Sequence, residues 1–505
     1  MLEFLPPIHD LAALPADVNS VAVYCSLLSD ELTPVSAFER LAAGSTNAFL
    51  LESVVGGEKI ARYSFLAADP AMIVESAGAR VRIRKGTEII PCEGTDPLEE
   101  VRRLLSQFRT TSSSPLPRFT GGAVGYAGYD VSRCYEKLGT PPKDDRFLPD
   151  LHFGLYDHMV IFDHVRKIAH LVAYAHKTDT VDWREAYQQA CSRIQDMAFC
   201  LSGQRKDELR PVPMRIPTEV SWESSFAREG YEQAVERCKN YIRAGDAFQV
   251  VLSQRLTTET SASPFDVYRA LRVINPSPFM FYLQTPSVVL VGSSPEVLCR
   301  IEGQTVSTRP LAGTRPRGRT EAEDRGLEAE LLADPKERAE HIMLVDLGRN
   351  DLGRVCEPGT VRVDDLMSVE RYSHVMHLCS NVSGTMAADK TSFDALRSVL
   401  PVGTVSGAPK IRAMQIIDEL EPVRRGPYAG AVGYIDFAGN MDTCIALRTL
   451  VICPAGDGRW RVDAQVGAGI VADSEPAKEY EETLNKAKAM LSAIAMANAW
   501  TESRS

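Results

Sequence analysis

The pattern of apolar and polar positions is clearest in the second half of the chain. Apolar residues recur at helical spacing over 231–242, and either Ser224 or Ser225 can serve as the N-cap of this predicted helix. The run over 247–253 predicts a buried strand, and a second capped helix is predicted over 263–274. Helices and strands therefore alternate irregularly in this half.

Short segments rich in β-forming residues follow the proline-containing turn at 275–278, over 279–291, and a strand-like alternation covers 460–471. The letters Gly-Ala-Val-Gly-Tyr occur twice, at 122–126 and 430–434, and predict strands of small residues packed closely on other backbone. This mixture lacks the regular strand–helix alternation of a Rossmann fold or a βα-barrel.

Composition excludes several classes of protein. Of the 505 residues, 44% are hydrophobic and 24% charged, which is typical of a soluble globular protein, and the net charge of −11 argues against nucleic acid or an anionic membrane as partner. The 11 cysteines include no Cys-x-x-Cys, so neither a disulfide framework nor a zinc ribbon is indicated. With no signal peptide and no apolar run near the ~20 residues of a membrane span, we expect a cytoplasmic protein. Polar stretches at 110–117 and 202–213 predict a loop and a linker between two regions, 1–210 and 220–495.

Two segments each place two carboxylates three residues apart on a predicted helix: Glu337 with Glu340, and Glu479 with Glu482. Residues i and i+3 share a helix face, so each segment offers both carboxylates to one point in space. If the two faces converge, they form an oxygen-lined site that suits Mg²⁺ and leaves positions for water and an anionic substrate. The alternative is two solvated helix faces.

The strand ending at Gly467-Ala468-Gly469 strengthens the first interpretation. Glycines let the backbone approach a ligand and present bare N–H groups to an anion, although a tight strand end also explains them. With the Glu479/Glu482 face and Lys486 just downstream, the segment indicates an anion-plus-metal site. No Gly-x-Gly-x-x-Gly or phosphate-binding loop is present, so nucleotide cofactors are not supported.

Taken together, these segments resemble the chorismate-utilising enzymes, most closely their anthranilate synthase branch. The motifs that carry the resemblance are Arg309–Gly318, Lys336–Asp351, His374–His377, Pro401–Lys410, Pro427–Gly433 and Gly467–Lys486, with looser matches at Leu50–Ser53 and Gly121–Asp130. The resemblance implies an α+β fold of two large packed antiparallel β-sheets with surrounding helices. It also implies that the two regions are intertwined in one compact fold.

The resemblance implies Mg²⁺ as cofactor, with Glu340 and Glu482 as ligands and Glu337 and Glu479 supporting them through water. It assigns the substrate chorismate to Gly313, Thr314, Thr404, Tyr428, Arg448, Gly467, Ala468, Gly469 and Lys486. One substrate carboxylate would meet the metal, and the other suits Arg448, whose planar fork pairs bidentately with a carboxylate. Arg448 lies in an apolar run where an unpaired arginine would be costly, although a surface charge is the alternative.

The implied reaction aminates chorismate with loss of its 4-hydroxyl and then eliminates pyruvate to give an aromatic amine. Glu296 matches the general acid for hydroxyl departure, which would need a raised pKa at neutral pH. His377 matches the histidine that assists the second step, where near-neutral titration suits proton transfer. Gln249 stands where isochorismate and salicylate synthases place a water-activating lysine, which points to ammonia as nucleophile. Ala312 stands where aminodeoxychorismate synthases often carry a nucleophilic lysine.

Two further expectations concern regulation and partners. Leu50–Ser53 and Asn275–Met280 resemble a tryptophan feedback site, so Ser53, Pro278, Phe279 and Met280 are expected to bind L-tryptophan; a turn packed on a strand explains either piece equally well. No cysteine lies in a Gly-x-Cys-x-Gly nucleophile elbow, so ammonia is expected from a glutamine amidotransferase subunit.

Two alternatives stay open: an aminodeoxychorismate synthase component, and a non-catalytic subunit that senses chorismate or tryptophan. The chain retains the candidate metal ligands Glu340 and Glu482 together with Glu296 and His377. This combination argues against a sensor, which needs no general acid.

Overall fold

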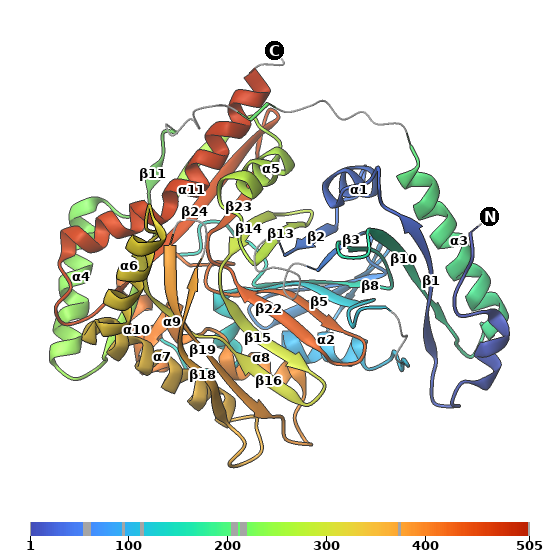
Figure 1. Ribbon diagram of the computed structural model, residues 1–505, viewed down its shortest axis with the longest axis horizontal. Helices are drawn as coiled ribbons and strands as arrows, with labels where there is room; N and C mark the ends of the chain where they lie inside the picture. The colour runs from blue at the N-terminus through green and yellow to red at the C-terminus, as the bar shows by residue number, and fades with distance from the viewer. Residues whose placement is uncertain are drawn as a thin grey trace.

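The computed structural model describes residues 2–53, 62–92, 96–111, 116–203, 211–212, 220–371 and 375–502. Its strands form two twelve-stranded sheets whose neighbouring strands all pair antiparallel, with helices around them (Figure 1). The predicted α+β fold of two large antiparallel sheets is confirmed. Most of the predicted linker at 202–213, the centre of the loop at 110–117, and His374 lie outside the described residues.

The first sheet consists, in spatial order, of β1 (Ser20–Leu28), β10 (Ile168–His176), β9 (His158–Asp163), β3 (Tyr63–Ala68), β2 (Ala48–Glu52), β13 (Phe279–Gln284), β14 (Val289–Ser294), β23 (Thr449–Gly456), β24 (Arg459–Ile470), β12 (Gln249–Thr260) and β11 (Glu223–Ser224), with β20 (Gly407–Ala408) also paired to β12. The second consists of β17 (Leu311–Pro316), β19 (Val375–Thr385), β16 (Thr305–Thr308), β15 (Val297–Glu302), β22 (Met441–Ile445), β21 (Ala431–Asp436), β7 (Gly122–Ala127), β8 (Leu151–Tyr156), β4 (Met72–Ala77), β5 (Arg80–Lys85) and β6 (Glu88–Pro91), with β18 (Arg362–Arg371) also paired to β19.

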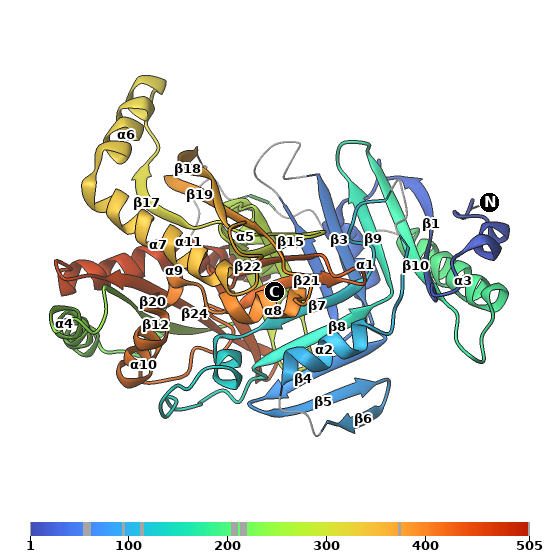
Figure 2. The same ribbon diagram turned by 90° about the horizontal axis from the view of Figure 1, so that it is seen from below.

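The helices are α1 (Pro34–Leu41), α2 (Pro97–Leu105), α3 (Trp183–Leu201), α4 (Arg228–Arg243), α5 (Pro264–Ile274), α6 (Glu321–Ala333), α7 (Pro335–Gly353), α8 (Ser392–Val399), α9 (Gly403–Ser406), α10 (Lys410–Leu420) and α11 (Pro476–Glu502), with 3-10 helices η1 (Ile8–Ala13) and η2 (Tyr129–Cys134). Helix α11 lies against α4, α5 and β24, whereas α6 extends away from the rest of the molecule (Figure 2). None of the helices in the described ranges has an apolar stretch of the length that a membrane span requires.

Each sheet contains strands from both halves of the chain, joined at a single junction. In the first sheet β2 pairs with β13, with Leu50 opposite Tyr282, and in the second β7 pairs with β21, with Gly125 opposite Gly433. The two Gly-Ala-Val-Gly-Tyr segments thus lie side by side, as strands of small residues. A Cβ atom at Gly125 would lie 1.9 Å from the carbonyl oxygen of His152, so only glycine fits there.

Alternating side chains of β2 show where the two cores lie. Phe49 belongs to the core between the sheets, where its ring packs edge-on against Tyr156 with centroids 4.8 Å apart. Its neighbours Ala48 and Leu50 belong to a second core, between the outer face of the first sheet and α1, α3, α5 and α11. This follows from the two-residue period of a strand.

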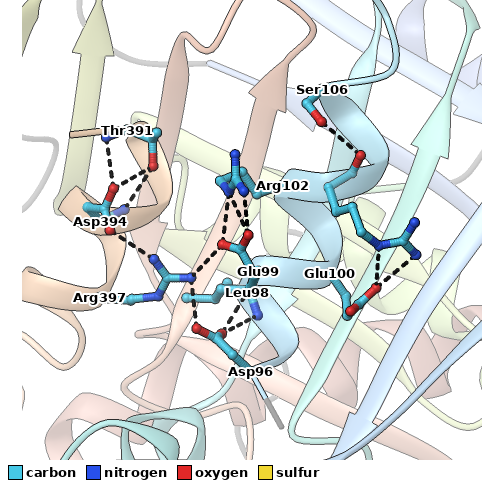
Figure 3. Close-up of polar contacts among 10 residues, drawn as sticks. Asp96, Leu98, Glu99, Glu100, Arg102, Ser106, Thr391, Asp394 and Arg397 are labelled. Atoms are coloured by element: carbon cyan, nitrogen blue, oxygen red, sulfur yellow. Dashed lines mark hydrogen bonds and ion pairs between the residues drawn. The ribbon is translucent and has the colours of Figure 1, made fainter. Parts of the chain in front are cut away.

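An ion-pair network joins helices from the two halves (Figure 3). Arg397 on α8 donates to Asp96, the N-cap of α2, at 2.8 Å and to Asp394 on its own helix at 2.9 Å. Asp394 also completes a capping box with Thr391 at the start of α8. The network holds α2 beside α8 at the edge of the core between the sheets.

The helix beginning predicted at Ser224 or Ser225 is wrong by about one turn. Helix α4 begins at Arg228 with Ala227 as N-cap, because Ser224 lies in β11 and the Ser225 hydroxyl accepts from the backbone N–H of Arg255 at 3.0 Å. These serines complete the edge of the first sheet instead. The predicted helix at 263–274 is confirmed, since α5 starts after Ser263, whose hydroxyl accepts from the N–H of Asp266.

Candidate active site

The glycine-rich end of β24 lies against the start of β12. Gly469 pairs with Val251 and Gly467 with Ser253. A Cβ atom at Gly469 would lie 2.8 Å from Nε2 of Gln249 and 3.8 Å from Oε1 of Glu340. A side chain at this position would therefore fill the space between the strand and these two polar groups, so glycine keeps it open.

Helix α7 carries the first carboxylate pair to this point. Asp334 caps the helix by accepting from the N–H groups of Lys336 and Glu337, and Pro335 occupies the first turn. Glu340 Oε1 then accepts a hydrogen bond of 2.9 Å from Nε2 of Gln249. The other amide atom, Gln249 Oε1, is buried and has no hydrogen-bond partner among the described residues.

Helix α11 carries the second pair to the same place. Lys486 donates to the carbonyl oxygen of Gly467 at 2.8 Å and pairs with Glu482 at 2.7 Å. The hydrogen bond from Lys486 attaches α11 to the end of β24. Glu482 lies one turn before Lys486 on the same helix face, because the two residues are spaced i, i+4.

The two acidic faces converge. Burial raises the pKa of Glu340, and the negative charges of Glu337 and Glu482 raise it further. Burial likewise raises the pKa of Glu479, with Glu482 adding to the effect. These carboxylates are oxygen donors that repel one another, so their chemistry fits a hard divalent cation.

The metal role nevertheless stays a prediction. In the described ranges, no three His, Cys, Asp or Glu side chains are already arranged to hold a metal ion.

The buried guanidinium of Arg448 lies nearby. Across the residues that the structure describes, no carboxylate comes within ion-pair distance of Arg448, and burial lowers the pKa of its guanidinium. Its backbone has φ of 49°, the left-handed region that a bulky residue rarely adopts, which is typical of functional positions. The buried Tyr428 interacts with Arg448, and its hydroxyl lies 2.9 Å from where a Cβ of Gly467 would be.

His377 is held by the turn at Gly313. Thr314 on β17 pairs with His377 on β19, and a bulge at Gly313, which has φ of 67°, brings its carbonyl oxygen to 2.9 Å from Nδ1 of the histidine. The Thr314 hydroxyl lies 3.1 Å from the same nitrogen. Because a carbonyl only accepts, Nδ1 carries the proton and Nε2 carries the lone pair.

The expected near-neutral titration of His377 is wrong. Burial lowers its pKa to about 4, and the charges of Arg448 and Lys486 lower it further, so the ring is neutral at pH 7. These interactions also show that Arg448 and Lys486 lie near His377.

Glu296 lies between β14 and β15 and is only 5% exposed. Burial raises its pKa to about 8, although the Thr404 hydroxyl and the backbone N–H of Leu311 offset part of this effect. The carboxyl group is therefore largely protonated at neutral pH.

The four predicted tryptophan-binding residues lie together at the junction of β2 and β13. Met280 pairs with Glu52, the residue before Ser53, and Pro278 and Phe279 lead into the same end of β13. The Ser53 hydroxyl is buried without a hydrogen-bond partner among the described residues, and the segment after it, 54–61, lies outside them. Phe279 pairs with Ser294, two residues before Glu296, so this cluster adjoins the candidate acid.

The sequence analysis missed Arg315 at this site. It donates to Glu337 at 3.3 Å and pairs with Asp334 at 2.8 Å and Glu330 at 2.9 Å, so it links β17 to α6 and α7. The available signal was its place directly after Gly313 and Thr314, but a charge in such a motif gives no indication of its partner.

Comparison with known proteins agrees with this geometry. Residues 47–492 match the family described as chorismate binding enzyme. Anthranilate synthase component 1 from Acetivibrio thermocellus is 48% identical over 496 residues, covering 97% of this chain and 98% of that protein. The Synechocystis sp. protein of the same name is 46% identical over 504 residues, covering 97% and 99%.

The crystal structure of anthranilate synthase component I from Streptococcus pneumoniae superimposes with a TM-score of 0.76 at 36% identity, covering 92% of this chain and 99% of that one. Sequence and fold agree over nearly the full length, well beyond the motifs of the site. The chain therefore belongs to the chorismate binding enzymes and, among them, to the anthranilate synthase component 1 group.

Proposed function

We propose that this chain is the large component of an anthranilate synthase, which converts chorismate and ammonia to anthranilate and pyruvate in the first step of tryptophan biosynthesis. The observation that carries the proposal is the Gln249 amide, which donates to Glu340 and leaves in the site a buried acceptor oxygen that has no partner among the described residues. A neutral amide cannot activate water as a base, but its oxygen can accept an N–H of ammonia, which is a competent nucleophile by itself.

Substrate binding follows from the charges of the site. Arg448, which has no carboxylate partner in the described ranges, suits one carboxylate of chorismate, with backbone groups of Gly467–Gly469 alongside. Glu340 and Glu482 would hold Mg²⁺, with Glu337 and Glu479 supporting them. The ion, when bound, would supply the positive charge that the second substrate carboxylate needs in this acidic setting.

Two side chains would handle the protons. Glu296, protonated at neutral pH, donates to the departing 4-hydroxyl as ammonia forms its bond to the ring, so that water leaves. His377, neutral with its proton on Nδ1, can accept at Nε2 the ring proton that is lost when the C–O bond to pyruvate breaks. Each pKa shift thus supplies the protonation state that its step requires.

The proposal includes a partner and a regulator. Relatives named component 1 imply a second component, and we assign it the role of a glutamine amidotransferase that supplies ammonia. We assign tryptophan inhibition to the cluster of Ser53 with Pro278, Phe279 and Met280. The buried Ser53 hydroxyl, for which the described part of the chain offers no hydrogen-bond partner, lies beside an apolar strand end and supports this assignment.

The test is turnover of the purified chain with chorismate, Mg²⁺ and ammonium, with anthranilate followed by fluorescence and pyruvate by a coupled dehydrogenase. We expect equal amounts of the two products, and loss of both when Mg²⁺ is chelated. Formation of an aminated product without pyruvate would favour the aminodeoxychorismate alternative, although Ala312 offers no amine for a covalent route. Binding of chorismate without any turnover would favour the sensor.

A further inference from the structure

A buried ion pair that no step above uses lies against the segments proposed to bind chorismate. Arg425 is 2% exposed and Glu421, the residue that ends α10, is 5% exposed. The guanidinium donates to both carboxylate oxygens, from Nε at 2.9 Å and from Nη2 at 2.6 Å. Removing two charges from water costs free energy that their attraction does not always return, so stability alone is a weak reason for such a pair.

The arginine binds segments that carry candidate substrate residues. Its Nη1 donates at 2.7 Å to the carbonyl oxygen of Val405, the neighbour of Thr404, and its Nη2 donates at 2.7 Å to that of Val251, which pairs with Gly469. The guanidinium also lies 5.6 Å from the ring centroid of Tyr428. One side chain therefore contacts α9, β12 and the ring of Tyr428, which lies three residues further along its own segment.

The glutamate extends this arrangement along the strand. Glu421 Oε1 accepts from both the backbone N–H and the hydroxyl of Ser253, each at 2.8 Å. Ser253 pairs with Gly467, and its hydroxyl also accepts from Nε2 of Gln465 at 2.9 Å. Strand β12 is thus held by the ion pair at two residues, directly opposite the two glycines of the site.

We infer that Arg425 and Glu421 are positioning residues, which hold the segments of Thr404, Tyr428 and Gly467–Gly469 in the relative places that chorismate binding requires. The inference rests on the proposed function, because it takes these segments as the substrate-binding ones. The relative positions of these three segments matter, because displacement of a substrate-positioning group by about 1 Å can reduce a rate by about 10²-fold. Lysine cannot replace the arginine, because it lacks the planar fork that reaches two carbonyls and a carboxylate together.

A matched control is the ion pair that Arg133 of η2 makes with helix α10. Arg133 donates to Asp418 of α10 at 2.9 Å and to Asp130 at 2.6 Å, and its side chain is 16% exposed. It makes no described hydrogen bond to the three substrate segments. Arg133→Lys therefore disturbs a comparable ion pair and removes none of the hydrogen bonds that Arg425 and Glu421 make.

The experiment compares Arg425→Lys, Glu421→Gln and Arg133→Lys for chorismate KM, kcat and melting temperature. We expect Arg425→Lys and Glu421→Gln to raise the KM for chorismate at least about tenfold and to lower kcat, with the KM for ammonium near normal. In Arg133→Lys, the KM for chorismate should stay near normal. The double variant Glu421→Met with Arg425→Met removes both charges together. It should keep much of the stability while losing chorismate affinity, because an apolar pair of similar volume can replace buried ions.

The outcomes separate the two proposals. If the unmodified enzyme makes no anthranilate, the proposed function fails, and chorismate binding by calorimetry then compares the same variants. If the unmodified enzyme is active and Arg425→Lys or the double variant binds chorismate normally, the positioning role is overturned and the pair serves the fold alone. The positioning role is also overturned if Arg133→Lys and Arg425→Lys lose chorismate affinity to the same extent, in proportion to their loss of melting temperature.

Discussion

Replacing Glu296 by Gln tests the acid at the centre of the proposed chemistry. The side chain keeps its size but can no longer release a proton. Burial raises the pKa of the native carboxyl from its ordinary value of 4.5 to about 8, a difference that corresponds to an upper limit of about 5 kcal/mol between its two protonation states. This magnitude has consequences for stability and for activity.

The sign for stability follows from proton binding. Between pH 4.5 and about 8, the folded chain keeps a proton on Glu296 that the unfolded chain releases. The stabilisation from this group is therefore fully present below pH 4.5 and is lost as the pH rises through about 8. Urea unfolding at several pH values should show the free energy of unfolding of the native enzyme falling toward alkaline pH relative to that of Glu296→Gln.

The pH dependence of the activity should report the ionisation of the same carboxyl group. We expect kcat of the native enzyme to fall as Glu296 ionises near pH 8, and Glu296→Gln to lose about 10²–10⁴-fold at neutral pH together with this alkaline limb. The assay follows anthranilate fluorescence, with total ammonium adjusted so that free ammonia is constant at every pH. Glu481→Gln, an exposed position on α11, is the control. A Glu296→Gln enzyme with near-normal turnover, or with the alkaline limb intact, would refute the assignment.

The remaining predictions concern the metal, the second half-reaction and regulation. Glu482→Ala should abolish turnover with either glutamine or ammonia at any chorismate concentration, because it removes a ligand of the proposed Mg²⁺ ion that would hold the substrate carboxylate; near-normal turnover at ordinary Mg²⁺ would contradict this. His377→Met should still aminate chorismate and accumulate a pyruvate-bearing intermediate detectable by chromatography, whereas equal slowing of both half-reactions would count against the assigned division. Ser53→Phe should relieve tryptophan inhibition and leave uninhibited turnover nearly intact, and calorimetry that finds no tryptophan binding to the native chain would remove the regulatory site.

Local periodicity accounts for what could be predicted from the sequence. The pairs Glu337/Glu340 and Glu479/Glu482 were found because the spacing of three residues on a helix is a property of the helix itself. Gly469 was found because a strand that ends in glycine signals close approach of another group. Such signals need no knowledge of the rest of the fold.

Tertiary contacts explain what could not be predicted. Glu421 and Arg425 are four residues apart near a helix end, a spacing that is usually a solvated pair, and only the packing of β12 and α9 around them buries it. The low pKa of His377 likewise comes from burial beside two cations that are distant in sequence. The start of α4 was misplaced because a serine before an apolar run has the same local signature whether it caps a helix or completes a sheet edge.

The single junction in each sheet constrains how the chain folds while it is being made. When the ribosome has released only the first 210 residues, β2 and β7 already exist, but their partners β13 and β21 do not. Both strands are then open edges with apolar side chains, the kind of surface that pairs with other nascent chains. Neither sheet can be completed until β21 and β24 have been translated, so most of the polypeptide must be synthesised before the native core exists. We therefore expect a fragment released between the two halves to aggregate rather than to form a smaller folded protein.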